Sequence, residues 1–579
     1  MNLNKLYKLK SYLDNKYFLW PLIIFASAFT FRLLGLLFIK NEFIFQVPML
    51  DSAYYNAWAV EIVKNNDWIG KSAQAVLVSP GYPYFLAVIY SIFGINILPA
   101  VMIQCLVSAL ICCIVYKLGK DLFNRSAGII AGLILSAYGL DIFYSLFLLK
   151  AVYINLFSLL VILSLWVALE KSNLWFVLLA GLLTGLVSQF RPDIMVFCFL
   201  FILWVFFFLR ERKISFRIKF ILVFLTGLVY ILVPIYLKNY YVTKEPVIFT
   251  SHGGGTFYTG NNSLSPGYFI EMPFAHSDAK YEQLDFMYEA SKRLKRRITP
   301  NEASSFWFQE GIKYIRNNPF KWLMLEIKKF SLFWNHQEIP INMNYDFFKD
   351  KYPVFKILFL HWGIIAPFAL IGLYFVFVYR GIKNNGIMLI SLFLISNIII
   401  GMVFFVSSEY RYPALPVLIL FGGYGIIRII NEFINGNMDK RIKIAICMLV
   451  LLVFCNLRIY KDNFSYAYSN LGLLLLEKGQ IEEAENEIQK AIELDPNSGF
   501  NWMVLGNLYF DKNQKDKALS AYEKSIELTP YADAYSRIGI IYLSEGKKKI
   551  AKEVLEKALE LAPGHQEARY YYSLTLQKR

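Results

Sequence analysis

The sequence predicts an all-α protein in two parts, a polytopic bundle of about eleven transmembrane helices followed by an α-solenoid of short helix pairs. The first observation behind this prediction is composition. Of 579 residues, 57% are hydrophobic and only 18% are charged, and the mean hydropathy is +0.43. Soluble chains are typically about 25% charged. The second observation is a repeat of about 34 residues near the C-terminus. Together they exclude a disordered, collagen-like or disulfide-rich secreted protein.

Eleven apolar runs approach or reach the length that crosses a bilayer, which is roughly 17–25 helical residues. One further run, Pro80 to Leu98, is ambiguous by length alone. All six cysteines lie in apolar runs, so the sequence offers no disulfide framework. The eleven runs occupy residues 18–39, 99–117, 126–143, 151–169, 174–190, 194–209, 218–237, 355–379, 386–406, 413–430 and 442–459.

Basic residues decide how Pro80–Leu98 is interpreted, because Lys and Arg accumulate in cytoplasmic loops. The most basic short loop is 210–219, and other basic clusters precede the first run or follow the second, eighth and tenth runs. All of these basic clusters lie on the same side of the membrane only if Pro80–Leu98 lies in the membrane interface or enters and leaves the membrane on one side. We therefore expect residues 41–98, residues 238–353 and the chain after Asn456 on the external side. External repeats favour the plasma (inner) membrane of a prokaryote.

The C-terminal region repeats four features in register. Gly472, Gly506 and Gly539 recur at steps of 34 and 33, each with an aromatic residue four positions before it and Ala twelve after it, and Pro recurs at the same steps. Small residues let paired helices approach, and Pro ends the second helix. The pattern resembles the tetratricopeptide repeat. The expected repeats span 465–498, 499–532 and 532–565, followed by a capping helix at 566–579, and the whole repeat domain spans 465–579.

The function of such repeats is only broadly specified by their sequence. Arrays of this kind usually bind a protein or peptide in their concave face. The repeats are therefore expected to recruit an acceptor or a partner protein, with a stabilising or dimerising appendage as the alternative.

Several polar motifs fall at the expected external ends of the apolar runs. Asp51 follows the first run and opens a short amphipathic segment, and Ser79-Pro80-Gly81 opens the interfacial helix. Four longer motifs follow along the chain, at Leu179–Asp193, Gly254–Asn262, Phe333–Glu338 and Ser408–Pro416.

In their order and position these motifs resemble the GT-C superfamily of integral-membrane glycosyltransferases. The branch they resemble most is that of the protein O-mannosyltransferases and lipid A aminoarabinose transferases. The resemblance covers about residues 15–455 and implies a transmembrane glycosyltransferase domain at 1–460. In that family an acidic pair often follows the first span, whereas here the pair is Asp51-Ser52, so the second carboxylate is missing. No cofactor is assigned with certainty, and a divalent metal stays an open alternative.

The resemblance implies transfer of a hexose or pentose from a polyprenyl-phosphate donor to an external acceptor, with inversion by single displacement. Asp51 is expected to be the general base, and cations are expected to stabilise the departing phosphate. Donor and phosphate binding is assigned to Arg191, Arg411, Lys150 and Glu409. The substrate-cavity loop is assigned to Tyr54, Tyr55, Tyr82, Gly254, Tyr258, Asn261, Asn262 and Glu338. The sugar stays open, as does the acceptor, which is protein, lipid or glycan; a nucleic-acid partner is not expected.

Each candidate residue also has a purely structural interpretation. Asp51 could cap a helix, Arg191 and Arg411 could anchor span ends in lipid headgroups, and Glu409 could simply pair with Arg411. Arg32, inside the first run, is expected to reach the external headgroups by the same mechanism.

A separate motif predicts the start of a helix and implies no catalytic or binding role. Thr299-Pro300-Asn301-Glu302 is typical of a capping box with proline at the first helical position. It predicts a helix that runs to about Asn317.

Two other classes of function remain open from the sequence. A polymerase or ligase of lipid-linked polysaccharide is also polytopic with a large external loop, but it would not need Asp51. A transporter or a membrane scaffold that displays the repeats would leave the shared loop motifs without a role.

Overall fold

The computed structural model describes residues 16–68, 79–275, 279–380, 384–562 and 564–577. Throughout these ranges the chain folds into helices and forms no strand, apart from an isolated bridge between Tyr268 and Val406. The all-α prediction is therefore confirmed.

The described helices follow one another in four groups. The N-terminal bundle contains α2 (Lys16–Ile39), α3 (Phe43–Gln46), α4 (Asp51–Asn65), α6 (Gly81–Phe93), α7 (Ile97–Leu122), α8 (Arg125–Ser136), α9 (Gly139–Ser145), α10 (Ala151–Lys171), α11 (Leu174–Phe190), α12 (Ile194–Phe208) and α13 (Ile214–Thr243). The long loop forms α14 (Gly253–Gly260), α15 (Ala279–Leu294), α16 (Pro300–Asn317), α17 (Pro319–Trp334), α18 (Tyr345–Lys351) and α19 (Pro353–Lys356). The second part of the bundle contains α20 (Trp362–Phe375), the π-helical turn η1 (Val376–Arg380), α21 (Asn385–Val403), α22 (Ser408–Arg411), the 3₁₀ turn η2 (Tyr412–Ala414), α23 (Leu415–Asn435) and α24 (Met438–Cys455). The repeats form α25 (Ser465–Glu477), α26 (Ile481–Leu494), α27 (Gly499–Asp511), α28 (Lys515–Leu528), α29 (Ala532–Ser544), α30 (Lys548–Leu561) and α31 (Gln566–Leu576).

Fewer helices than expected are long and apolar enough to cross a bilayer on their own. Among the described residues there are seven, or up to eight if α8 and α9, which meet at a 56° bend, make one span. Helices α11 and α12 have 17 and 15 residues. At 1.5 Å per residue they reach roughly 22 to 26 Å, short of a hydrocarbon core of about 30 Å. The predicted count of about eleven is thus not reached by length and composition, although these spans still make the chain an integral membrane protein.

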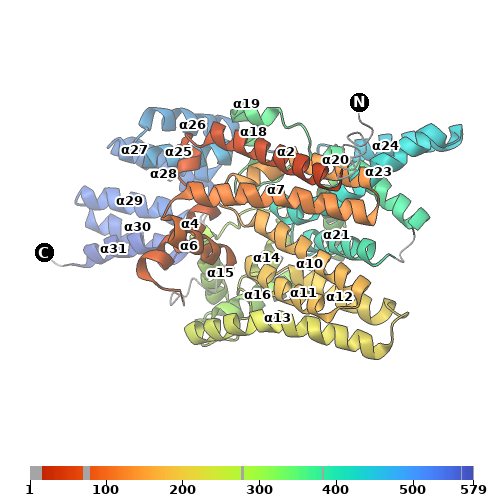
Figure 1. Cartoon of the computed structure of the whole chain (residues 1–579). Helices are drawn as coiled ribbons and strands as arrows, with labels where there is room; N and C mark the ends of the chain where they lie inside the picture. The colour runs from red at the N-terminus through yellow and green to blue at the C-terminus, as the bar shows by residue number, and fades with distance from the viewer. Residues whose placement is uncertain (1–15, 69–78, 276–278, 381–383, 563, 578–579) are drawn as a thin grey trace.

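The bundle has two chemically different ends. The basic turns between α12 and α13 and between α23 and α24 lie at the right of Figure 1, and the repeats lie at the left. Helix α6 has 13 residues and buries one face, with Val88, Ile92 and Phe93 exposed on the other. It is too short to cross a bilayer, in agreement with an interfacial position.

Helix α16 begins as its sequence predicts. The Thr299 hydroxyl accepts from the Glu302 amide, the Glu302 carboxylate accepts from the Thr299 amide, and Pro300 occupies the first turn. These reciprocal bonds satisfy two amides that would otherwise lack partners. The predicted end at Asn317 is also observed.

A buried ion pair joins the first span to the bend between α8 and α9. Arg32 and Asp141 are both fully buried and paired, and the Ser108 hydroxyl donates to the same Asp141 oxygen at 2.8 Å. The other Asp141 oxygen accepts from the Tyr412 hydroxyl. The expectation that Arg32 reaches the headgroups is therefore wrong. Its charge is compensated inside the bundle, because an unpaired buried guanidinium would carry a large desolvation penalty.

The repeats pack on the long loop between α13 and α20. Lys351 pairs with Glu487 at 3.1 Å, and the rings of Phe347 and Tyr468 meet edge to face at 4.9 Å. The chain that leads into the repeats is held as well, because Gln337 accepts from the amides of Ile459 and Tyr460. The solenoid is therefore seated on the bundle by specific contacts.

Breaking the Arg32–Asp141 pair is expected to destabilise the bundle. Arg32→Met leaves Asp141 charged and buried, a change that typically costs about 3–5 kcal/mol. The double variant Arg32→Met/Asp141→Leu is expected to recover much of that loss, because no uncompensated charge remains. Thermal unfolding in detergent measures both variants. Lys313→Met, which removes an exposed ion pair with Glu310, is the matched control, and a single variant as stable as this control would contradict the prediction.

Candidate active site

One cavity of about 400 Å³ brings together four of the predicted site residues. Asp51, Lys150, Arg191 and Glu409 all line it. It lies where the ends of α4, α10, α11 and α22 meet the helices of the long loop. We call it the central cavity.

Asp51 stands at the first position of α4 and does not cap it. The capping position is Leu50, which has a positive φ of 52° and makes no side-chain cap. A residue with a Cβ pays for that backbone conformation in strain. The side chain of Asp51 is left to accept hydrogen bonds from Tyr55 Oη at 3.2 Å and Asn342 Nδ2 at 3.1 Å. These donors hold the carboxylate at the cavity wall.

Asn342 connects the two carboxylates of the site. Its Nδ2 donates to Asp51 Oδ2 at 3.1 Å and to Glu409 Oε1 at 2.6 Å. A primary amide has two donor hydrogens, so one side chain can orient both acids. The structural alternative, a Glu409–Arg411 ion pair, is not what the structure shows.

Arg191 provides a cation with unused hydrogen-bonding capacity. Its Nη1 donates to the backbone oxygen of Glu409 at 2.7 Å, and its Nε pairs with Asp193 at 2.6 Å. The guanidinium stacks on Tyr410 at 4.2 Å. Its Nη2 is buried without a partner among the described residues. A fixed guanidinium with a free N–H is suited to bind an anion such as phosphate.

Lys150 adds a second positive charge to the cavity wall. It precedes α10, and its Nζ lies 5.7 Å from the ring centroid of Tyr55. Tyr55 therefore contacts both Lys150 and Asp51, which places a carboxylate and a cation around one aromatic ring.

Arg411 does not line the central cavity, so its position does not support the predicted phosphate contact. It is 1% exposed and pairs with Glu338 at 2.9 Å. It also donates to the carbonyls of Asn335 at 2.5 Å and Gln337 at 2.7 Å. These bonds assign Arg411 to holding the 335–338 segment against α22.

The residues predicted for the substrate-cavity loop lie near the central cavity but do not line it. Tyr82 donates to Gln104 at 2.6 Å, Tyr54 packs edge to face on Tyr55, and Tyr258 packs on Trp307. The amides of Asn261 and Asn262 donate to carbonyls of their own helix, α14. At Gly254 a Cβ would stand 1.7 Å from the Ser304 carbonyl oxygen, so glycine permits the contact between α14 and α16. Thr256 of the same motif and the two residues before the motif, His252 and Gly253, line the cavity instead.

A further carboxylate faces Asp51 from the long loop. Burial, together with the negative charges of Asp51, Glu271 and Asp285, raises the pKa of Glu282 to about 8. His252 Nε2 lies 4.0 Å from it, and burial lowers the pKa of His252 to about 4. At neutral pH both groups are therefore largely uncharged, so Glu282 does not add a full negative charge beside Asp51.

Comparison with known families agrees with this geometry. Residues 78–237, which include Ser79 at the cavity wall and most of α13, match the family described as dolichyl-phosphate-mannose-protein mannosyltransferase. This match confirms the resemblance to the GT-C transferases. Residues 465–498, 501–531 and 532–565 match tetratricopeptide-repeat families, which confirms C-terminal repeats of this type. No curated protein matches the chain.

Solved structures with a similar outline include two crystal structures of membrane transferases. For the apo oligosaccharyltransferase of Archaeoglobus fulgidus, identity is 13% and the TM-score is 0.41, over 78% of this chain and 57% of that one. The chain therefore spans little more than half the length of that transferase. For ArnT from Cupriavidus metallidurans bound to undecaprenyl phosphate, identity is 11% and the TM-score is 0.43, over 96% and 88% of the two chains. At these scores the likenesses carry no further argument.

The ionisation of Glu282 predicts a pH-dependent effect on stability. Its pKa of about 8 exceeds the ordinary value of 4.5, so the native state binds this proton more tightly than the unfolded chain does. Stability contributed by the protonated carboxyl is present at low pH and is lost as pH rises to about 8. Glu282→Gln is therefore expected to raise the unfolding temperature at pH 9 more than at pH 5. Glu289→Gln on the same helix controls for loss of a carboxylate. An equal change in the unfolding temperature of Glu282→Gln at both pH values would contradict the raised pKa of Glu282.

Proposed function

We propose that this protein is a membrane glycosyltransferase that moves a sugar from a polyprenyl-phosphate carrier to a nucleophilic acceptor on the external side. The observation that carries the proposal is the central cavity, where the carboxylate of Asp51 faces two cations, Lys150 and Arg191. Transfer needs a base for the acceptor and positive charge for the leaving phosphate. The family match over residues 78–237 supports the same reaction class.

The proposed mechanism is a single displacement. The acceptor oxygen attacks the anomeric carbon while Asp51 takes its proton. The bond from the anomeric carbon to the phosphate oxygen breaks, and its electron pair stays on the phosphate. Arg191 and Lys150 stabilise that charge, and the sugar configuration inverts. Arg411 is not part of this step in the proposal, because Glu338 and backbone carbonyls occupy it.

Asn342 and Glu409 serve positioning roles in this mechanism. Asn342 holds the carboxylates of Asp51 and Glu409 in a fixed relation. The remaining acceptor capacity of Glu409 is suited to a hydroxyl of the transferred sugar. The hydrogen-bonding side chains around the cavity do not identify that sugar, so hexose and pentose donors both fit.

The proposed topology keeps about eleven crossings. The shorter helices α11, α12 and α24 and the bent pair α8–α9 complete the set, which requires local thinning of the bilayer or flanking loops that reach the interface. Basic turns then lie in the cytoplasm, and the central cavity and the repeats lie outside, at the inner membrane of a prokaryote. In this proposal the transferase domain covers 1–460 and the repeat domain covers 465–579.

The residues present do not form a conventional metal site. Within the described ranges no group of three or more His, Cys, Asp or Glu side chains is placed to hold a metal ion. We derive no step through a metal. The metal alternative is tested by measuring turnover in EDTA and after addition of Mg²⁺ or Mn²⁺.

Replacing the base is expected to abolish turnover. Asp51→Asn keeps the side-chain size but cannot accept the acceptor's proton, so turnover is expected to fall by roughly 10²–10⁴-fold. The measurement is sugar release from polyprenyl-phosphate mannose, glucose and aminoarabinose by the full chain in detergent. Unchanged turnover in Asp51→Asn would contradict this mechanism and favour a polysaccharide polymerase or ligase.

The two arginines are expected to differ in what they control. Arg191→Lys keeps a charge but loses the guanidinium fork, so the KM for donor is expected to rise by roughly tenfold or more, as for loss of a charge-assisted hydrogen bond. Arg411→Lys is expected to lower the unfolding temperature with a smaller effect on donor KM. Donor kinetics and thermal unfolding are measured for both variants. A larger rise in donor KM for Arg411→Lys than for Arg191→Lys would assign the phosphate contact to Arg411 instead.

A further inference from the structure

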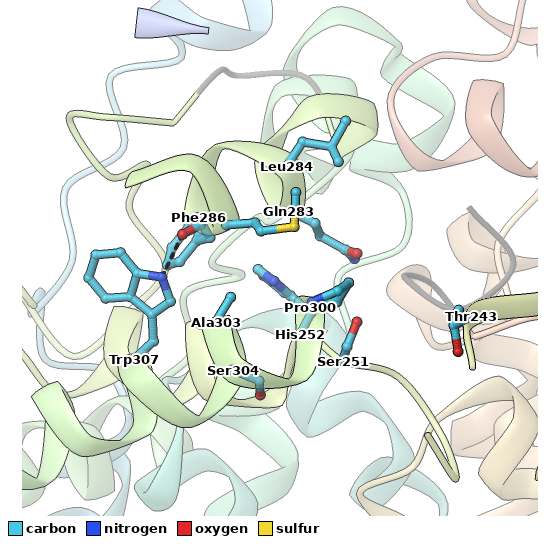
Figure 2. A pocket seen from close by; sticks show the side chains of 12 residues that line it. Thr243, Ser251, His252, Gln283, Leu284, Phe286, Pro300, Ala303, Ser304 and Trp307 are labelled. Atoms are coloured by element: carbon cyan, nitrogen blue, oxygen red, sulfur yellow. Dashed lines mark hydrogen bonds between the residues drawn. The ribbon is translucent and has the colours of Figure 1, made fainter. Parts of the chain in front are cut away.

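A second cavity of about 250 Å³ opens beside the central one, inside the helices of the long loop. It lies between α14, α15 and α16, close to Thr243 at the end of α13 (Figure 2). Pockets that hold a whole small ligand are typically about 300–1,000 Å³. This one therefore suits a single side chain better than a whole substrate. We call it the side cavity.

One end of the side cavity is apolar and rigid. Phe286, Met287, Ala303 and Trp307 form its wall. Trp307 is 1% exposed, stacks on Phe274 at 5.0 Å, and donates through Nε1 to the Phe286 carbonyl at 2.8 Å. Because these rings are already packed and hydrogen-bonded, the wall does not collapse to fill the space.

The other end carries polar atoms without partners. Ser251 is 7% exposed, and its hydroxyl makes no hydrogen bond within the described structure. The Oε1 of Gln283 is also buried without one. A buried polar atom without a hydrogen-bond partner is destabilising, so both are placed for a ligand that supplies hydrogen-bonding groups. Figure 2 shows Gln283, His252 and Ser251 on the side toward Thr243, away from Trp307.

The two cavities share part of their walls. His252 and Gln283 line both of them. A molecule with one group in the central cavity can therefore place a neighbouring group in the side cavity. That group must be apolar at its tip and attached to a backbone that donates or accepts hydrogen bonds at its base.

The position of the side cavity favours the acceptor over the donor as its occupant. It lies among the external helices beyond the last residue of the α13 span. The lipid tail of a donor runs from its phosphate into the bilayer, the opposite way. A glycan presents mainly hydroxyl groups, whereas this wall is made of aliphatic and aromatic side chains. The third repeat also reaches this layer, because a Cβ on Gly564 would meet the Tyr288 hydroxyl of α15 at 3.0 Å, and arrays of such repeats commonly bind peptides.

We propose that the side cavity is a specificity subsite for an apolar side chain of a peptide acceptor, next to the residue whose hydroxyl receives the sugar. This inference rests on the proposed function. The side chain contacts Phe286, Met287, Ala303 and Trp307, and the adjoining peptide groups bond to Ser251 and Gln283. The acceptor is thereby selected by sequence context as well as by its hydroxyl.

The test measures transfer to synthetic peptides with one Thr in a glycine-rich host. Leu, Phe or Gln is placed at each position flanking the Thr. At one position, Leu or Phe is expected to raise kcat/KM by at least about tenfold over Gln, the discrimination that a small apolar contact supports. Ala303→Phe fills the cavity and is expected to remove this preference. Ser305→Phe, at an exposed position of the same helix, is the matched control and keeps it. Ala303→Val provides a smaller filling if the Phe variant does not fold.

A binding experiment on the wild-type protein makes the result independent of variants and of turnover. The same peptide carries a photoreactive benzophenone at the preferred position, or at each flanking position in turn if transfer shows no preference. This peptide is expected to crosslink to residues of α15 or α16 that line the side cavity. Excess Leu peptide competes and Gln peptide does not. Crosslinks elsewhere, no crosslink, or equal kcat/KM for all flanking residues would overturn the subsite.

The outcomes distinguish failure of the proposed subsite from failure of the proposed transferase function. Donor turnover that depends on Asp51 but never reaches a peptide would overturn the subsite and keep the transferase. Donor turnover unaffected by Asp51→Asn would overturn the proposed mechanism, whatever the crosslinking shows.

Discussion

The structure depends on how the short segment from Ser407 to Pro413 is fixed between the bundle and the long loop. Three of its side chains leave in different directions, as successive residues of a helical turn do. Glu409 meets Asn342 at the central cavity, Arg411 pairs with Glu338, and Tyr412 bonds to Asp141. The anchors of Arg411 and Tyr412 belong to buried ion-pair networks, so Glu409 in the same turn is held in place with little freedom. The geometry around Asp51 follows, because Asn342 bonds to both acids.

These anchors are costly in an apolar bundle and are acceptable only when every charge is compensated. Arg32 is paired with Asp141, and Arg411 with Glu338. Among the described residues, Arg191 Nη2 and Arg411 Nε are both buried without a partner, but of these two arginines it is Arg191 that lines the central cavity. The other bonds of Arg191 go to Asp193 and a backbone oxygen. Since electrostatic interactions strengthen where water is excluded, a guanidinium held in this way is prepared for an anionic ligand before that ligand arrives.

The sequence predicts those features that depend on local pattern. The capping box at Thr299 has the expected bonds, and Asp51, Lys150, Arg191 and Glu409 line one cavity, each standing near the end of an apolar run. Features that depend on tertiary contact were not predictable. Asn342 and Gln283 lie in the long loop with no local signal, and only packing brings them to the cavity. The position of Arg411 was not predictable for a related reason, since Glu409 lines the cavity and the helical turn directs the two side chains apart.

Hydropathy along the chain indicates apolar composition but not helix geometry. The run at 126–143 is predominantly apolar, yet the chain bends by 56° between α8 and α9. Hydropathy contains no term for that bend. It places Asp141 beside Arg32 rather than at a helix end facing lipid, and it brings Tyr412 to the same carboxylate. The bend is therefore tied to the same network that fixes Glu409, so the bend and the geometry of the central cavity depend on one set of buried contacts.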